Sequence, residues 1–119
     1  MHHLQAHTFS DPDETRPFVD KGKAEMIDLD GTMVGCGTFE PGWRWSEHVK
    51  PIAGTDSCQI SHIGYIVSGR MKIHMDNQEE FEVGPGDIAR IPPGHDAWTL
   101  GDEPCKMVDF GEIDTYAKR

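Results

Sequence analysis

The chain has 119 residues, with 11 lysines and arginines against 21 aspartates and glutamates, and a formal net charge of −10. This length fits a single domain, and the acidic balance works against binding to phosphate backbones or anionic lipid. We therefore expect no nucleic-acid and no membrane partner. The N-terminal segment lacks the basic start and apolar stretch of a signal peptide, which predicts a cytoplasmic protein.

Cysteine usage agrees with a reducing compartment. The three cysteines, Cys36, Cys58 and Cys105, are an odd number without Cys-x-x-Cys spacing, so neither a disulfide framework nor a cysteine-rich zinc site is indicated. We expect Cys36 and Cys105 to be small buried hydrophobic residues on strands. The role of Cys58 stays open at this point.

The N-terminal region shows no helical or strand periodicity. Residues 1–22 hold three histidines, an Asp-Pro-Asp-Glu run and two prolines, and we expect a partly ordered arm there. The folded domain is expected over 23–113, followed by a C-terminal tail over 114–119.

Strand patterns begin at residue 24. Two alternating segments, 24–29 and 32–40, are separated by Asp30 and Gly31. An Asp-Gly pair suits a tight turn because glycine adopts positive φ without strain. These segments are therefore predicted to form a β-hairpin.

The next run, 42–48, also alternates, and it predicts a third strand. On a strand, Arg44, Ser46 and His48 would share one face, opposite the tryptophans of this run. Arg44 would then point toward the same cavity as His48 and could hold a carboxylate. A solvent-exposed or ion-paired Arg44 is the alternative.

The second half of the chain continues this rhythm, with turns rich in glycine and proline between short apolar runs. Strands that recur about every 8 to 12 residues favour an all-β sandwich or barrel. No helix longer than one turn is predicted before residue 114. The remaining strands are expected at 58–67, 70–76, 81–83, 88–91, 97–100 and 105–110.

Two glycine- and proline-rich turns carry a family resemblance. Segments 84–87 (Gly-Pro-Gly-Asp) and 91–95 (Ile-Pro-Pro-Gly-His) resemble the second conserved motif of cupins, in which Gly86, Pro92 and Gly94 fall into place. The resemblance covers roughly residues 24 to 110. It implies an all-β, single-domain jelly-roll barrel, the double-stranded β-helix of cupins, which usually holds a metal near one end.

The first cupin motif is matched with departures. Its pattern is His-x-His, three or four residues, Glu, six residues and Gly. Gly69 supplies the terminal glycine, and His62 stands where the family has Glu. We match His48 to the second histidine and Ser46 to the first, which leaves a long loop before His62.

The second motif also departs at its ligand. Ala97 stands where the family has histidine, but His95 lies two residues earlier, and in an extended chain both share one face. The resemblance thus implies a three-imidazole site of His48, His62 and His95. Three neutral nitrogens suit Zn, Fe, Ni or Cu. A metal-free pocket is the alternative, because two family ligand positions are changed.

Other residues are candidates for ligand binding. Gly64 shares a strand face with His62 and would leave space beside it, which a ligand or a neighbouring side chain could fill. Trp98 could stack against a planar ligand. The full set of expected ligand-binding residues is Arg44, Ser46, Cys58, Gly64 and Trp98.

Three functions fit these residues. The first is a small cupin whose metal-capable histidine pocket binds or transforms a small molecule. The alternative is a non-catalytic sensor or accessory cupin that binds a small molecule without metal, and a third option is a structural dimer module with a filled barrel. Single-domain cupins commonly pair through N-terminal strands, so the resemblance implies a homodimer, and an N-terminal arm beside exposed strand edges suits such pairing.

Overall fold

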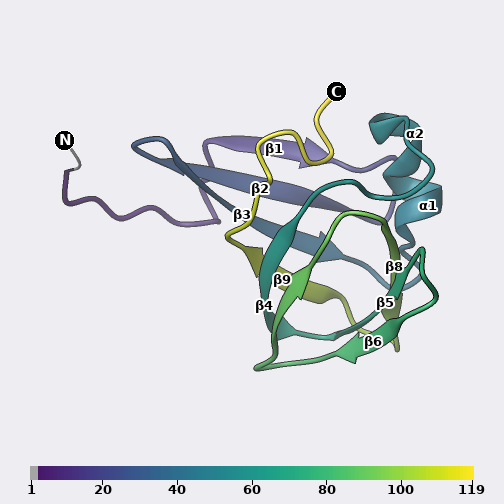
Figure 1. Cartoon of the computed structure of the whole chain (residues 1–119). Helices are drawn as coiled ribbons and strands as arrows, with labels where there is room; N and C mark the ends of the chain where they lie inside the picture. The colour runs from purple at the N-terminus through teal and green to yellow at the C-terminus, as the bar shows by residue number, and fades with distance from the viewer. Residues whose placement is uncertain (1–2) are drawn as a thin grey trace.

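The computed structural model describes residues 3–119, and in this part of the chain nine strands and two one-turn helices form (Figure 1). The first half of the chain supplies β1 (Glu14–Pro17), β2 (Gly22–Leu29), β3 (Thr32–Phe39), α1 (Trp45–His48) and α2 (Lys50–Ala53). The second half supplies β4 (His62–Ser68), β5 (Arg70–Met75), β6 (Glu80–Val83), β7 (Ile88–Ile91), β8 (His95–Leu100) and β9 (Cys105–Asp109).

The strands form two antiparallel sheets that face each other across the core (Figure 1). The larger sheet has the strand order β1-β2-β3-β9-β4-β7, and the smaller sheet has the order β6-β5-β8. Each sheet contains neighbouring strands that are distant in sequence, such as β3 with β9 in the larger sheet and β5 with β8 in the smaller one. This is the jelly-roll barrel that the strand rhythm and the motifs predicted, and the predicted fold class is confirmed.

The predicted hairpin of β2 and β3 is confirmed. Leu29 pairs with Thr32 across the turn, and Asp30 and Gly31 have φ values of 52° and 95°. Two successive left-handed residues define the type I′ turn, whose twist matches that of the flanking strands. The Asp-Gly pair therefore sets the register of eight consecutive pairs in this hairpin.

The strand predicted over 42–48 is wrong. Arg44 is extended, but the chain then enters α1, where the Val49 amide donates to the Trp45 carbonyl oxygen. Trp43, which precedes the extended Arg44, and Trp45, which begins the helical turn, are both buried, each 2% exposed. Ser46 and His48 therefore lie on a helical turn and do not share a strand face with Arg44.

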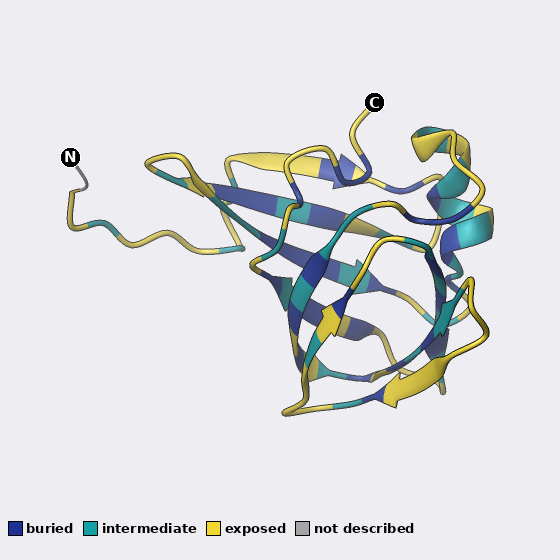
Figure 2. Cartoon of the chain, in the orientation of Figure 1, coloured by how far each residue is buried: buried dark blue, intermediate teal, exposed yellow. Residues whose placement is uncertain are grey.

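The core lies between the two sheets and extends from Phe18 to the C-terminal residues Ile113, Tyr116 and Ala117, whereas the N-terminal arm is mostly exposed (Figure 2). Cys36 and Cys105 are buried, as predicted. The region expected as an arm contains β1, whose buried Arg16 donates from Nη1 to the carbonyl oxygens of Ile113 and Tyr116 at 3.2 and 2.9 Å. Tyr116, in the segment expected as a tail, is itself buried. No helix in residues 3–119 is long and apolar enough to cross a membrane.

Candidate functional site

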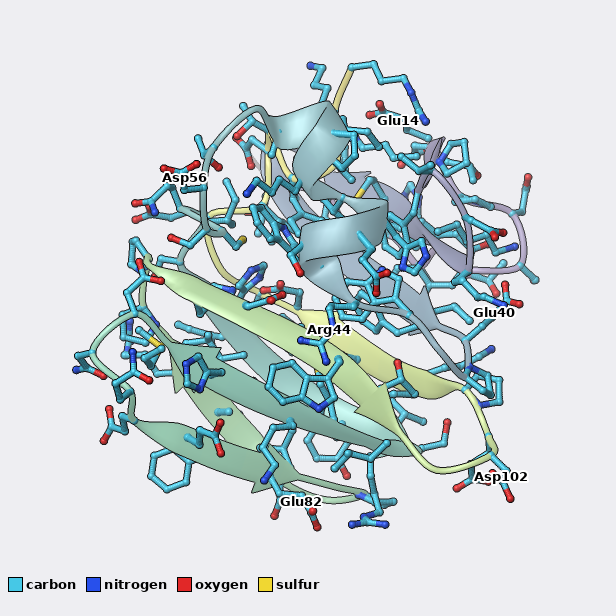
Figure 3. All side chains as sticks on the ribbon, turned by 90° about the vertical axis from the view of Figure 1, so that its right-hand side faces the viewer. Glu14, Glu40, Arg44, Asp56, Glu82 and Asp102 are labelled. Carbon is cyan, nitrogen blue, oxygen red and sulfur yellow. The ribbon has the colours of Figure 1, made fainter. Side chains whose placement is uncertain are left out.

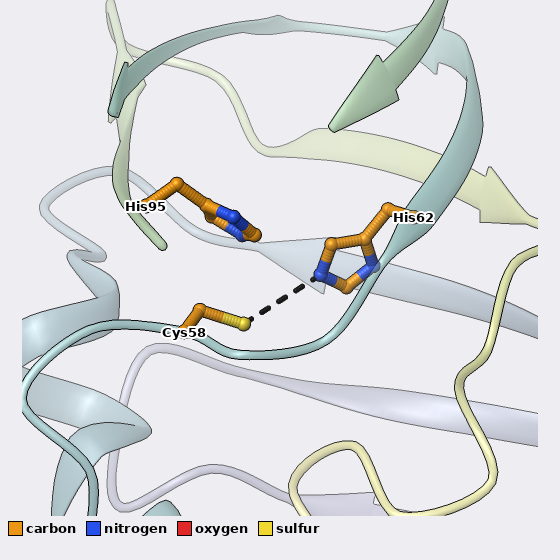
Figure 4. Close-up of side chains that lie close together, drawn as sticks. All are labelled: Cys58, His62 and His95. Carbon is orange, nitrogen blue, oxygen red and sulfur yellow. Dashed lines mark hydrogen bonds between the residues drawn. The ribbon is translucent and has the colours of Figure 1, made fainter. Parts of the chain in front are cut away.

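Three potential metal ligands converge inside the barrel. Cys58, His62 and His95 are all buried, and one ligand atom of each lies within 4.8 Å of the others (Figure 4). The Cys58 Sγ and His62 Nε2 atoms are 3.7 Å apart. The ring centroids of His62 and His95 are separated by 5.2 Å. Two imidazoles and one thiol therefore meet at one point in the core.

Backbone hydrogen bonds fix Cys58 opposite His95. The Cys58 amide donates to the His95 carbonyl oxygen at 2.7 Å, and the Gly94 amide donates to the Cys58 carbonyl oxygen at the same distance. This isolated bridge extends the free edge of β8. The Pro-Pro-Gly turn thus places His95 in the core, and the backbone of Gly94 and His95 positions Cys58.

His62 begins β4 and is held from both sides. It lies opposite Ile91 in the pairing with β7, and the Phe110 and Glu112 amides donate to the carbonyl oxygens of Ile63 and Ser61. Gly111 packs so closely here that an added Cβ would lie 2.8 Å from the His62 Cα. The backbone that carries His62 therefore has little freedom to shift.

Asp109, at the end of β9, orients the His62 ring. Its Oδ2 atom is hydrogen-bonded to His62 Nδ1, and Oδ1 accepts from the Gly111 amide at 2.9 Å. The carboxylate is only an acceptor, so His62 Nδ1 carries a proton. The other nitrogen, Nε2, is left to face Cys58.

His95 has a similar anchor. Its Nδ1 atom lies 2.7 Å from the Pro92 carbonyl oxygen, and because a carbonyl only accepts, this nitrogen is the donor. The free lone pair is then on Nε2. Metal-bound histidines commonly show this pattern, in which a carboxylate or a backbone carbonyl holds the second ring nitrogen.

The contacts within the cluster of Cys58, His62 and His95 favour the charged forms of Cys58 and His62. Burial disfavours the Cys58 thiolate, but hydrogen bonds and positive charge from His62 and His95 outweigh it and lower the pKa of Cys58 to about 6. Burial likewise disfavours a charged His62, but its bonds to Asp109 and Cys58 raise the pKa of His62 to about 9. Without metal, the pair therefore favours a thiolate beside an imidazolium. By contrast, burial raises the pKa of Cys105 to about 12.

A small internal cavity adjoins the two histidines. Its volume is about 20 Å³, and its lining includes His62, His95, Trp43, Trp45 and Tyr116. A volume above about 10–15 Å³ holds one water-sized group. Burial, followed by the charges of Cys58 and Asp109, raises the pKa of Tyr116 well above its ordinary value, so this phenol stays protonated.

A larger hollow opens at the surface between β6 and β7. It has a volume of about 470 Å³ and an apolar floor that includes Ile73, Val83 and Ile91. Ile91 also borders the small internal cavity. One side chain therefore lies between the surface hollow and the space beside His62 and His95.

The structure does not bring His48 to His62 and His95. Its Nδ1 accepts from the Arg44 amide at 3.0 Å on the helical turn α1, and among the described residues the metal-capable group contains Cys58 instead. The reason is local: the helical turn replaces the strand on which His48 was expected to face inward. The three-imidazole set is thus replaced by two imidazoles and a thiol.

Arg44 and Trp98 lie on the outer side of the small sheet. The Arg44 guanidinium carbon is 4.2 Å from the Trp98 ring centroid, and Figure 3 shows Arg44 at the surface. Trp98 alternates with the buried Ala97 on β8 and therefore faces away from the core. Ser46 donates its amide to Asp96 Oδ1 at 3.1 Å. None of these three residues lines the internal cavity.

Gly64 is buried beside the site, and a neighbouring side chain fills its space. A Cβ at this position would lie 2.3 Å from the Met107 sulfur. Met107 also lines the internal cavity. Of the two occupants considered for this space, the structure shows the protein's own side chain.

Two residues of the site were missed from the sequence. Asp109 was not among the residues expected at the site, but it is 5% exposed and follows Cys105 and Met107 on the inward face of β9. The strand alternation was the signal for it. No spacing rule pointed to Tyr116, whose ring packs edge-on against His62 at 5.3 Å.

A motif spacing also pointed to Cys58. Three residues separate Cys58 from His62, which is a spacing that the first cupin motif allows between its second histidine and its glutamate. Counting back from His62 thus places Cys58, and not His48, at that histidine position. The contacts of Cys58 in the barrel agree with this alignment.

The donor set fits a transition-metal ion. A thiolate and two imidazoles are ligands of zinc and copper, and three protein ligands leave a further position open. His62 and His95 each have the second nitrogen anchored, and Asp109 supplies a buried negative charge next to the group. The thiolate shifts the preference toward zinc and copper within the range of Zn, Fe, Ni and Cu expected from the sequence.

Comparison with known families agrees with this architecture. Residues 56–111 match the family described as "Cupin domain", and this segment contains all three converging residues and Asp109. The resemblance to cupins is confirmed, and the chain carries a cupin domain. No curated protein is significantly similar in sequence.

Solved structures show the same fold at low identity. A protein of unknown function (DUF1255) from Acidithiobacillus ferrooxidans is 18% identical, with a TM-score of 0.59 over 82% of this chain and 85% of that one. The polyketide cyclase RemF from Streptomyces resistomycificus is 17% identical, with a TM-score of 0.63 over 90% and 78%. An oxalate decarboxylase of Bacillus subtilis is 17% identical, with a TM-score of 0.61 over 95% of this chain and 32% of that one. The similarity therefore extends to proteins of different function, and it defines the fold.

Proposed function

We propose that this cupin binds one transition-metal ion, zinc or copper, through Cys58, His62 and His95, and uses it to bind or transform a small molecule. One observation carries the proposal: three ligand atoms converge within 4.8 Å in the core. The anchored Nδ1 atoms of His62 and His95 support it, because they leave both Nε2 atoms free to coordinate.

The chain's own residues have defined roles in this proposal. The ion would supply Lewis acidity at its open position. Asp109 holds the His62 ring in one tautomer, and the Pro92 carbonyl does the same for His95. Tyr116 and the two buried tryptophans exclude bulk water from the small cavity. An organic ligand exceeds that volume of about 20 Å³, so it would occupy the hollow between β6 and β7 or displace Ile91.

The test is the metal content of the untagged full-length protein, measured by mass spectrometry beside Cys58→Ser and His48→Ala. We expect one metal ion per chain in the wild type and in His48→Ala, and none in the core of Cys58→Ser. The wild type and both variants retain the N-terminal histidines, so metal bound to those histidines contributes equally to all three samples and cancels when their metal contents are compared. A wild-type protein that stays empty after Zn(II) and Cu(II) are added would overturn the proposal.

A second candidate uses the same residues without metal. Cys58, His62 and Asp109 form a chain in which an acid orients a histidine next to a thiol, the arrangement that activates a cysteine nucleophile. With hydrogen peroxide, the thiolate sulfur would bond to one oxygen while the O–O bond breaks, giving a sulfenate and water. A metal-free protein that forms sulfenic acid faster at Cys58 than at Cys36 would favour this candidate.

We also propose a homodimer and a cytoplasmic location. Strand β1 is an edge of the large sheet, and three free cysteines fit a reducing compartment. Phe81 and Ile88 are large exposed apolar residues, at 66% and 69% exposure, that a partner could cover. Sedimentation that gives a 13.3 kDa species at tens of micromolar would rule out the dimer.

A further inference from the structure

Two buried indole groups lack hydrogen-bond partners in the part of the chain that the structure describes. The Nε1 atoms of Trp43 and Trp45 are both buried without an acceptor, and each side chain is only 2% exposed. An unpaired buried donor costs about 1–3 kcal/mol. Native proteins rarely leave two such donors together without a use for them.

Both rings line one cavity, the space of about 20 Å³ that also borders His62 and His95. The rest of its lining is largely apolar, with side chains that include Phe39, Ile91 and Met107. These side chains offer no strong acceptor for an indole N–H. The side chains of two tryptophans with unpaired N–H groups and of two histidines therefore border the same small space.

We propose that Trp43 and Trp45 form a donor site for a small anionic ligand, of about the size of one water molecule or halide ion, bound beside the metal position. The inference rests on the proposed function, because a metal ion held by Cys58, His62 and His95 would supply positive charge for an anion to which the indole N–H groups donate. The volume sets the size, and two N–H donors without an acceptor set the charge preference.

The hydrogen-bond donation of Trp43 and Trp45 can be tested separately from their apolar packing. Trp43 also packs against Phe39, with ring centroids 4.4 Å apart, and Phe18 joins the same stack. A phenylalanine at position 43 or 45 would keep most of this apolar packing while it removes the N–H group. Trp98, on the outer face of β8, serves as the matched control.

The experiment follows the indole N–H signals by NMR in the zinc-loaded full-length protein, as sodium chloride replaces sodium perchlorate at constant ionic strength. Each of the three tryptophans gives one indole signal, assigned with the Trp43→Phe, Trp45→Phe and Trp98→Phe variants. We expect saturable shifts of the Trp43 and Trp45 signals and no shift of the Trp98 signal. Removal of either inner N–H should weaken chloride binding by about tenfold, and Trp98→Phe should leave it unchanged.

The outcomes separate this inference from the proposed function. Zinc stoichiometry is measured first, and a protein that binds no zinc fails the proposed function before chloride is tested. A protein that binds one zinc but whose inner indole signals do not move overturns only the donor site and leaves a single trapped water as its occupant. Equal shifts of all three indole signals also overturn it, because they report a nonspecific salt effect.

Discussion

His62 and His95 lie inside the barrel, whereas His48 and His74 lie nearer its outside, and all four have an anchored Nδ1 atom. The partners are Asp109, the Pro92 carbonyl, the Arg44 backbone and, for His74, Glu80 at 2.7 Å. An anchored ring is therefore common to both regions and does not by itself mark a metal ligand. The inner pair differs because its rings converge on each other and on the Cys58 sulfur.

The inner and outer regions also differ in how strongly their charged groups interact. Arg44 lies over Trp98 and within 3.7 Å of Asp96, where solvent screens the interaction. Asp109 and His62 are about equally buried, with side chains 7% and 5% exposed. A hydrogen-bonded ion pair therefore shapes the inner site far more than the outer one.

The largest expected effect comes from the thiol. Cys58→Ser replaces a soft ligand by a weak one, so we expect the variant to lose nearly all bound metal. Cys36→Ala removes a buried thiol of β3 outside the cluster and should keep one metal ion per chain. Mass spectrometry of both purified proteins measures the difference. Equal metal content in the two variants would remove Cys58 from the site.

A smaller effect is expected at the carboxylate that orients His62. Asp109→Asn keeps the side-chain shape but weakens its hold on the His62 Nδ1–H group, so metal affinity should fall by about 10- to 100-fold. A competition titration against a coloured chelator measures this affinity. The control is Asp87→Asn, which changes a turn acid that accepts from the Gly84 amide. Unchanged affinity in Asp109→Asn would show that the ring needs no such anchor.

On the outer face, the expected effect is on stability and not on metal. Arg44→Ala removes the contact with the Trp98 ring and should lower the free energy of unfolding by about 0.5–1 kcal/mol. Urea denaturation measures this change, and metal content should stay at the wild-type level. Loss of metal in this variant would mean that Arg44 acts on the inner site.

The smallest effect is expected at His74. Its ring and Lys72 pair with Glu80 at the surface, and exposed pairs contribute about 0.2–1 kcal/mol. His74→Ala should therefore lower the free energy of unfolding by no more than this amount, again without loss of metal. An effect on metal content comparable to that of Cys58→Ser would contradict the division between inner and outer histidines.

The fold could be predicted because it depends on local signals. The Asp30-Gly31 turn and the Pro-Pro-Gly turn before His95 constrain the chain by their own conformational preferences. The alternation of residues along β8 correctly predicted that His95 and Ala97 share the inward face of the strand. Residue spacing was sufficient wherever regular strands carried it.

The rest of the site could not be predicted from local sequence patterns in the same way. Alternation fails where the backbone leaves the strand, so the helical turn after Arg44 moved His48 out of reach. Tyr116 reaches His62 through the packing of the C-terminal segment, a long-range contact that no local pattern encodes. Asp109 was predictable from the inward face of β9, but its charge suggested a surface position.

The central claim is that Cys58, and not His48, completes the metal site with His62 and His95. The most direct measurement is the absorption spectrum of the cobalt(II)-loaded protein, in which a thiolate ligand gives a charge-transfer band in the near ultraviolet. We expect this band in the wild type and in His48→Ala, and its absence in Cys58→Ser. A wild-type cobalt complex without the band, or a band lost in His48→Ala but kept in Cys58→Ser, would contradict the account.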